Sequence, residues 1–213
     1  MKVISTENMK TGTTTVAMVC KDGVVLAADQ KSTMGNLVAS KKAKKVHQIT
    51  DNMAMTIAGS VGDAQALIRL LKAEMRLYEL QEKTTTTKAA ATLLSNMLRG
   101  AYKSFVPEMV QLLLGGYDSR GAQLFSLDAA GGLQEEDEYT FSGSGSVIAV
   151  GVLEDGYKTS MTTDEGLELL IRAIKAARER DVFSGGKLMD IAIITKKGLE
   201  WVAPEKIKKL LTC

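Results

Sequence analysis

The segment Lys10-Thr11-Gly12-Thr13-Thr14-Thr15-Val16 carries four threonines in five consecutive positions. Such β-branched residues suit a half-buried β-strand. The same segment also fits a cleavage junction. If the Gly12–Thr13 bond is cut, Thr13 carries both a hydroxyl nucleophile and a free α-amino group that can serve as its base. The heptapeptide alone fits both interpretations, so the flanking sequence has to distinguish them.

The composition is that of an ordinary globular protein, with 213 residues, 45% hydrophobic and 24% charged. This length allows one domain with a buried core. A formal net charge of +2 gives no general attraction to nucleic acid or to an acidic membrane. No apolar run approaches the roughly 20 residues that cross a bilayer. We therefore expect neither a nucleic-acid partner nor a membrane partner.

The cysteines and acidic residues give no sign of a metal site. Cys20 and Cys213 lie far apart and lack metal-ligand spacing, which indicates a reducing compartment. The first dozen residues have no apolar secretory core, so we expect a cytoplasmic protein. We interpret the acidic run at 135–138 as a solvated turn and the eleven methionines as core fillers. No cofactor is expected.

The order of predicted elements indicates an α+β fold. The predicted strands cover 14–20, 24–29, 46–49, 53–58, 109–117, 122–128, 133–140, the approach to Ser142, 188–195 and 200–202. The predicted helices cover 59–81, 88–103, a short segment after 142–146, the segment from a capping box at Thr162 to Arg180, and a segment starting at Pro204. Strands and helices in separate runs favour sheets packed face to face with helices outside.

Hydrophobic residues at helical spacing predict which faces of the helices are buried. On the first helix they are Ala64, Leu67, Ile68, Leu71, Met75 and Tyr78. On the helix ending at Arg180 they are Leu167, Leu170, Ile171, Ile174 and Ala177.

Six short motifs occur in order along the chain: Thr11-Gly12-Thr13-Thr14-Thr15, Ala27-Ala28-Asp29, Lys44-Lys45-Val46, 57–63, 142–145, and Arg180-Asp181 with Ser184-Gly185-Gly186. Together they resemble a proteasome β subunit, most of all the single-type β subunits of archaea, over residues 11–202. The resemblance implies the four-layer αββα sandwich of the N-terminal nucleophile hydrolases. It also implies seven-membered β rings inside a barrel closed by rings of α subunits.

The resemblance implies a threonine endopeptidase of the proteasome core particle. Residues 1–12 would be a propeptide removed by self-cleavage of Gly12–Thr13, and residues 13–213 one catalytic domain. The substrates would be unfolded polypeptides, delivered by a regulatory ATPase. Until the cut, the chain would be a zymogen, because the Thr13 nitrogen is an amide and not a base.

Seven residues match the family's catalytic positions: Thr13, Asp29, Lys45, Gly59, Ser144, Asp181 and Ser184. Thr13 would be the nucleophile, and a buried Lys45 ammonium, oriented by Asp29, would stabilise developing negative charge. A Gly59 N–H would face the oxyanion, and the last three residues would hold the Thr13 amine. Without the resemblance, Lys45 is better explained as part of a solvated basic loop with Lys41, Lys42 and Lys44.

The family's first substrate pocket maps to Ser32, Ala43, His47, Ile57 and Val61, which are mostly small or apolar. Cleavage after hydrophobic residues is therefore expected. His47 is interpreted as a pocket-wall residue and not as a catalyst.

Two other interpretations stay open. An inert ring subunit that is never processed would have no need of Thr13, Asp29 and Lys45 together. A relative on the same fold is either the simpler bacterial protease ring or a small-molecule amidase. The helix over 163–180 and the long C-terminal part favour the proteasome type over the bacterial ring, and an amidase would more often expose Cys or Ser at its new N-terminus.

Overall fold

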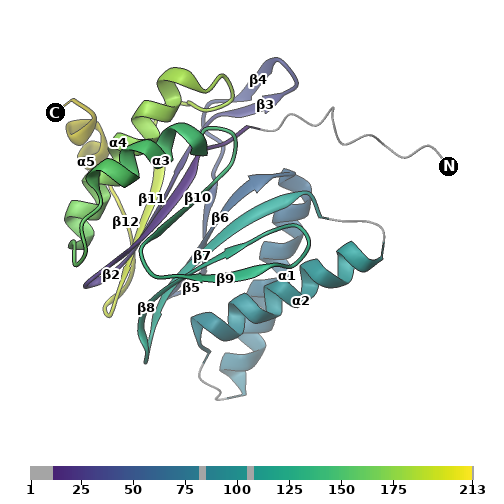
Figure 1. Cartoon of the computed structure of the whole chain (residues 1–213). Coiled ribbons are helices and arrows are strands. Elements are labelled where there is room, and N and C mark those ends of the chain that lie inside the picture. Colours follow the sequence, from purple (N-terminus) through teal and green to yellow (C-terminus); the bar gives the residue numbers. More distant parts are fainter. Residues whose placement is uncertain (1–11, 82–84, 105–107, 213) are drawn as a thin grey trace.

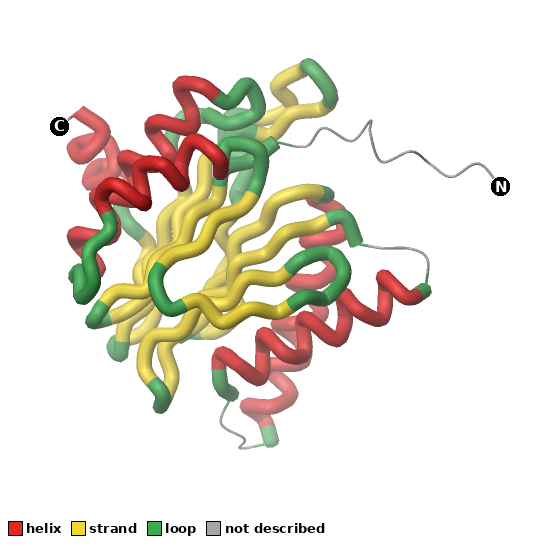
Figure 2. The backbone as a smooth tube through the Cα atoms, viewed as in Figure 1, coloured by secondary structure: helices red, strands yellow, loops and turns green. Residues whose placement is uncertain are grey.

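The computed structural model describes residues 12–81, 85–104 and 108–212. Two five-stranded antiparallel sheets lie face to face, and helices cover both outer faces (Figures 1 and 2). The layers follow the order helix, sheet, sheet, helix. The α+β, four-layer αββα prediction is therefore confirmed.

The first sheet has the strand order β10-β1-β2-β11-β12. Its strands are β1 (Thr15–Cys20), β2 (Gly23–Asp29), β10 (Tyr139–Ser142), β11 (Met189–Thr195) and β12 (Gly198–Trp201). In the predicted hairpin, Thr15 of β1 stands opposite Ala28 of β2. On its other side Thr15 stands opposite Ser142, so the start of β1 lies beside the loop that follows β10.

The second sheet has the strand order β5-β6-β7-β8-β9. Its strands are β5 (Val46–Thr50), β6 (Met53–Gly59), β7 (Val110–Asp118), β8 (Gly121–Leu127) and β9 (Leu133–Glu136). Because the predicted strand over 133–140 passes from one sheet to the other, it is divided: its first half is β9 and its last residues belong to β10.

A separate hairpin is formed by β3 (Ser32–Met34) and β4 (Leu37–Ser40). No strand was predicted in this region. Neither strand has a buried face, and Met34 and Leu37 are 70% and 68% exposed. The alternation of buried and exposed residues that identifies a strand is therefore missing here.

The helices divide between the two outer faces. Helices α1 (Val61–Leu80) and α2 (Thr87–Lys103) pack on the second sheet, and α3 (Ser146–Gly156), α4 (Thr163–Arg180) and α5 (Pro204–Thr212) pack on the first. The capping box of Thr162 and Glu165 is formed. All predicted inward residues of α4 are buried, and so are those of α1 except Tyr78, which is 42% exposed. Tyr78 belongs to a last turn whose Leu77 and Leu80 are also exposed, so the end of α1 lies outside the core.

The strand ends determine where polar residues gather. Strand β1 begins at Thr15 where β2 ends at Asp29, and β5 begins at Val46 close to where β6 ends at Gly59. Antiparallel neighbours start and end at the same edge of a sheet. The residues preceding β1 and β5 and those ending β2 and β6 therefore meet at one edge of the sandwich.

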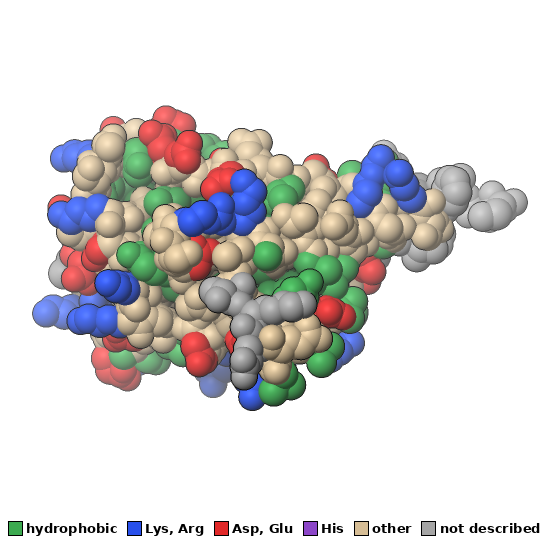
Figure 3. All heavy atoms as spheres, turned by 90° about the horizontal axis from the view of Figure 1, so that it is seen from below, with side chains coloured by type: hydrophobic (Ala, Val, Ile, Leu, Met, Phe, Trp, Pro, Cys, Tyr) green, Lys and Arg blue, Asp and Glu red, His purple; other side chains and the backbone are tan. Residues whose placement is uncertain are grey.

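The surface carries charges of both signs. On the face in Figure 3, Lys and Arg side chains lie among Asp and Glu side chains and exposed hydrophobic ones. Within the described ranges, no helix combines the length and the apolarity needed to span a membrane.

Candidate functional site

Thr13 lies two residues before β1 and is only 6% exposed. Its hydroxyl donates a hydrogen bond to the Gly12 carbonyl oxygen, 2.7 Å away. Its backbone N–H donates to Ser144 Oγ across 3.3 Å. The Thr13 hydroxyl thus lies beside the peptide bond that the sequence analysis identified as the cleavage site. Residues 1–11 of the expected propeptide and Cys213 are outside the described residues.

Gly12 is required for space. A Cβ added to it would lie 1.6 Å from Phe183 Cβ. Close packing against Phe183 is therefore the reason for a glycine at this position.

The loop after β10 contacts Thr13 closely. The Gly145 N–H donates to the Thr13 carbonyl across 3.3 Å. Gly143 has a φ of 88°, and a Cβ there would lie 2.1 Å from the same carbonyl oxygen. Glycine at 143 supplies both the backbone conformation and the space for this approach.

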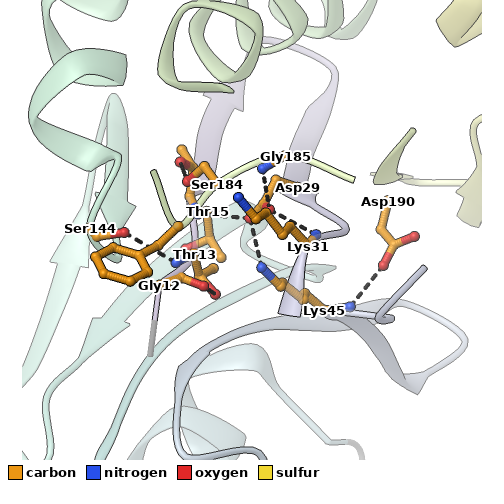
Figure 4. A network of polar contacts seen from close by, with 12 residues as sticks. Gly12, Thr13, Thr15, Asp29, Lys31, Lys45, Ser144, Ser184, Gly185 and Asp190 are labelled. Carbon is orange, nitrogen blue, oxygen red and sulfur yellow. Dashed lines mark hydrogen bonds and ion pairs between the residues drawn. The ribbon is translucent and has the colours of Figure 1, made fainter. Parts of the chain in front are cut away.

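Asp29 is a fully buried carboxylate that accepts four hydrogen bonds. Its Oδ1 accepts from Lys45 Nζ across 2.7 Å and from the Thr14 N–H across 2.9 Å. Its Oδ2 accepts from the N–H groups of Lys31 and Gly185, each across 2.9 Å. In Figure 4, Asp29 and Lys45 point toward each other, and Thr13 lies between this pair and Ser144.

Lys45 is buried, whereas Lys41, Lys42 and Lys44 are exposed. The solvated-loop interpretation is therefore wrong for Lys45. The Lys45 backbone N–H is fixed by Asp190 Oδ2 across 2.7 Å. Burial lowers the pKa of the Lys45 ammonium below its ordinary value, and the Asp29 carboxylate opposes this shift.

Ser144, Asp181 and Ser184 form a second polar group. Both serine hydroxyls donate to Asp181 Oδ2, each across 2.6 Å. Asp181 is the residue at which α4 ends, and its backbone carbonyl accepts the Ser184 N–H. A turn at the end of one helix thus aligns two hydroxyls on one carboxylate oxygen, and Ser144 connects that oxygen to Thr13.

A cavity of about 280 Å³ opens beside Thr13 and Lys45. Gly59 and all five predicted pocket residues line it: Ser32, Ala43, His47, Ile57 and Val61. His47 Nε2 lies 3.1 Å from the Lys44 carbonyl oxygen, and burial lowers the pKa of its imidazole. The structure thus places Gly59 and His47 in the cavity wall together with the other predicted residues.

Some site residues were missed from the sequence. Thr33 and Ser40 line the cavity from the unpredicted β3–β4 hairpin, and Gln65 lines it from α1. Asp190 holds the Lys45 backbone from within β11. The signal available in the sequence was one acidic residue, Asp190, interrupting the largely apolar run 188–195.

No group of three or more His, Cys, Asp or Glu side chains in the described ranges could hold a metal ion.

Comparisons with known proteins all match this chain to proteasome subunits, over almost its whole length. The family model described as "Proteasome subunit" matches residues 9–194. Proteasome subunit beta of Methanocaldococcus fervens is 51% identical over 202 residues, covering 94% of this chain and 89% of the relative. Proteasome subunit beta of Methanococcus aeolicus is 52% identical over 206 residues, covering 96% and 93%. For Methanosarcina barkeri the values are 52% over 200 residues, covering 93% of each.

The buried ion pair yields a stability prediction. Asp29→Asn leaves the Lys45 ammonium buried without its counter-charge, so we expect the free energy of unfolding to fall by about 3 kcal/mol. Urea denaturation of the isolated subunit measures it. The matched control is Glu135→Gln, which breaks the exposed pair of Lys88 and Glu135 and should cost under about 1 kcal/mol.

In a double-mutant cycle, Lys45→Met should cost less in the Asp29→Asn background than in the wild type. Equal, small losses of stability for Asp29→Asn and Glu135→Gln would contradict an energetic coupling of the two buried charges.

Proposed function

The chain belongs to the proteasome subunit family as an archaeal-type β subunit, and we propose that it is an active threonine endopeptidase. In this proposal Thr13 becomes the N-terminus after self-cleavage of the Gly12–Thr13 bond. It then hydrolyses peptide bonds of unfolded polypeptides. Residues 1–12 act as a propeptide, and residues 13–213 form the catalytic domain.

The observation that carries the proposal is the position of one buried lysine. Lys45 is an ammonium paired with Asp29, and it lines the same cavity as Thr13. Burying a lysine is costly, and a carboxylate partner offsets that cost only in part. A structural subunit has no use for a buried positive charge beside an open cavity. A hydroxyl nucleophile does have a use for it, because the charge stabilises the negative charge that develops when it reacts.

Self-cleavage follows from the position of the Thr13 hydroxyl. Its oxygen attacks the Gly12 carbonyl carbon, the C–N bond breaks, and the hydroxyl proton ends on the departing nitrogen. The product is an ester between Gly12 and the Thr13 oxygen. Water hydrolyses this ester, which releases the propeptide and restores the hydroxyl beside a free amine.

Substrate hydrolysis uses the same groups. The free α-amino group takes the Thr13 hydroxyl proton, and the oxygen attacks the substrate carbonyl. The Lys45 ammonium and the Gly59 N–H stabilise the negative charge that develops. Ser144, Asp181 and Ser184 hold the amine in place. The amine then protonates the leaving nitrogen, and water hydrolyses the acyl-enzyme.

The cavity supports a preference for hydrophobic residues before the cut. Ala43, Ile57 and Val61 give it apolar surface, and the described lining has no acidic side chain to pair with a basic substrate residue. Lys31, Lys44 and Lys45 add positive charge, which disfavours Lys and Arg further.

Assembly completes the proposal. We place the subunit in seven-membered β rings, enclosed by rings of proteasome α subunits, with a regulatory ATPase delivering substrate in the cytoplasm. Within the described residues, no feature favours the alternative of an inert, unprocessed ring subunit or of a bacterial-type ring.

Intact mass tests the processing step. On assembly with α subunits, the chain should lose residues 1–12 and retain 213 − 12 = 201 residues. Thr13→Ala should keep the propeptide and lose hydrolysis, because both reactions use one hydroxyl. Thr13→Ser keeps a hydroxyl and serves as the control for assembly and cutting. A wild-type chain that retains its propeptide in the assembled particle would establish the inert alternative.

The rate should depend on pH in a bell shape. The acid limb rises as the α-amino group, with an ordinary pKa of about 7.7–8.0, loses its proton and becomes a base. The alkaline limb falls as Lys45 loses its charge. Because burial lowers the Lys45 pKa, this fall should come below its ordinary 10.5. Peptide hydrolysis by the assembled particle measures both limbs, and activity that persists undiminished beyond pH 10.5 excludes the role of Lys45.

A further inference from the structure

We propose that Thr14 is a positioning residue whose side-chain hydroxyl orients the hydrogen-bonded chain that holds the Thr13 nitrogen. This inference rests on the proposed function, since the nitrogen is the catalytic base only in an active subunit. From the sequence, Thr14 was predicted only as the first residue of the strand 14–20.

Thr14 lies between the two polar groups of the site. Its N–H donates to Asp29 Oδ1 across 2.9 Å, and its carbonyl accepts the Asp29 N–H across 3.1 Å. Its hydroxyl lies 2.6 Å from Ser184 Oγ. The Thr14 side chain is fully buried, and Ser184 is 3% exposed. One residue thus contacts the Asp29–Lys45 pair through its backbone and the serine–aspartate group through its side chain.

Counting protons fixes the direction of every bond in this chain. A carboxylate oxygen only accepts, and a hydroxyl has a single proton to donate. Ser184 donates that proton to Asp181 Oδ2, so it must accept from Thr14. Ser144 also donates to Asp181 Oδ2 and accepts from the Thr13 N–H. The Thr14 hydroxyl therefore donates to Ser184, which donates to Asp181. From the other side, the Thr13 N–H donates to Ser144, which donates to the same oxygen of Asp181.

Gly145 packs closely against the side chains of this hydrogen-bonded chain. A Cβ at Gly145 would lie 2.1 Å from Thr14 Oγ1, 2.9 Å from Ser184 Oγ and 3.1 Å from Asp181 Oδ2. The backbone of Gly145 therefore packs directly against the chain. The φ of Gly145 is −83°, which any residue adopts, so space is the reason for a glycine here.

Besides Asp181 at the end of α4, five other charged groups belong to the site, among them Asp190, which accepts from the Lys45 N–H. Asp29 ends β2, and Lys45 precedes β5. Lys31 and Lys44 line the cavity. A change confined to the Thr14 hydroxyl alters none of these charges. Its effect on the pKa of the Thr13 nitrogen must therefore pass through Ser184 and Asp181.

The sign of that effect follows from polarisation along the chain. Donation by Thr14 strengthens donation by Ser184, which stabilises the negative charge on Asp181. Without the Thr14 hydroxyl, the negative charge on Asp181 is less well stabilised, so Asp181 accepts more strongly from Ser144. The Thr13 ammonium, which donates to Ser144, is then stabilised as well. The pKa of the freed α-amino group then rises. The neutral amine, which is the base, is present only at higher pH.

The test is Thr14→Val, which keeps the β-branched shape and removes the hydroxyl. In particles assembled with α subunits and checked by intact mass, the acid limb of kcat/KM should move up by about half a pH unit. At pH 7 this corresponds to a loss of about threefold, because the base is mostly protonated there. Thr14→Ser, which retains the hydroxyl, should restore the wild-type profile.

Thr15→Val is the matched control. Thr15 is equally buried, and its hydroxyl lies 2.6 Å from Ser142 Oγ, but no hydrogen bond among the described residues links that pair to Asp181. It should leave the acid limb in place. In a Ser184→Ala background, Thr14→Val should give no further shift, because its route to Asp181 is gone. If Thr14→Val prevents assembly, Thr14→Ala replaces it, since it removes the same hydroxyl with a smaller side chain, and the same upward shift is expected.

Each outcome decides a different point. An inactive wild-type particle overturns the proposed function and this inference with it. An active wild type in which Thr14→Val and Thr15→Val give the same acid limb overturns only the inference. So does a shift by Thr14→Ser as large as that by Thr14→Val.

Discussion

The buried charge of Asp29 is the constraint on which the rest of the site depends. A carboxylate removed from water is tolerated only when its oxygens are satisfied and its charge is balanced. Four donors satisfy the Asp29 carboxylate here. They are the N–H of Thr14 just before β1, the N–H of Lys31 two residues after β2, the N–H of Gly185 in the loop after α4, and the Lys45 ammonium. The same bonds that compensate the charge hold four separate segments together. The site therefore exists only when those segments are packed.

The three consecutive threonines divide their side chains among three environments. Thr13 faces the cavity, Thr14 bonds to Ser184, and Thr15 bonds to Ser142. An extended chain turns successive side chains to opposite sides, so neighbours in sequence meet different partners. The choice of threonine follows from this, since a β-branched hydroxyl residue suits both a strand and a polar contact. The strand interpretation and the cleavage interpretation of this segment are compatible because they concern different residues.

The sequence predicted most of the regular structure, because strands and helices with one buried face leave a periodic signal. It failed where that signal is absent. The β3–β4 hairpin has no buried face, and Tyr78 follows the helical spacing into a turn that extends beyond the core. The order of the motifs predicted Asp29, Lys45 and Asp181 as catalytic candidates, but it gave no information about their contacts. The contacts themselves depend on tertiary packing. The Asp190 bond to the Lys45 backbone and the Ser184 bond to Thr14 join residues far apart in sequence, and no local pattern marks them.

Gly12 would keep the proposed enzyme inactive in two ways. While it is attached, the Thr13 nitrogen is an amide and its hydroxyl is occupied by the Gly12 carbonyl. Gly12 also lines the cavity in which a substrate would have to lie, and it fits there only because it has no side chain to meet Phe183. Loss of the propeptide would therefore create the base and vacate part of the cavity in one step. A larger residue at this position would displace the scissile carbonyl from the Thr13 hydroxyl. In the proposed enzyme, the packing that permits self-cleavage would therefore also block substrate before the cut.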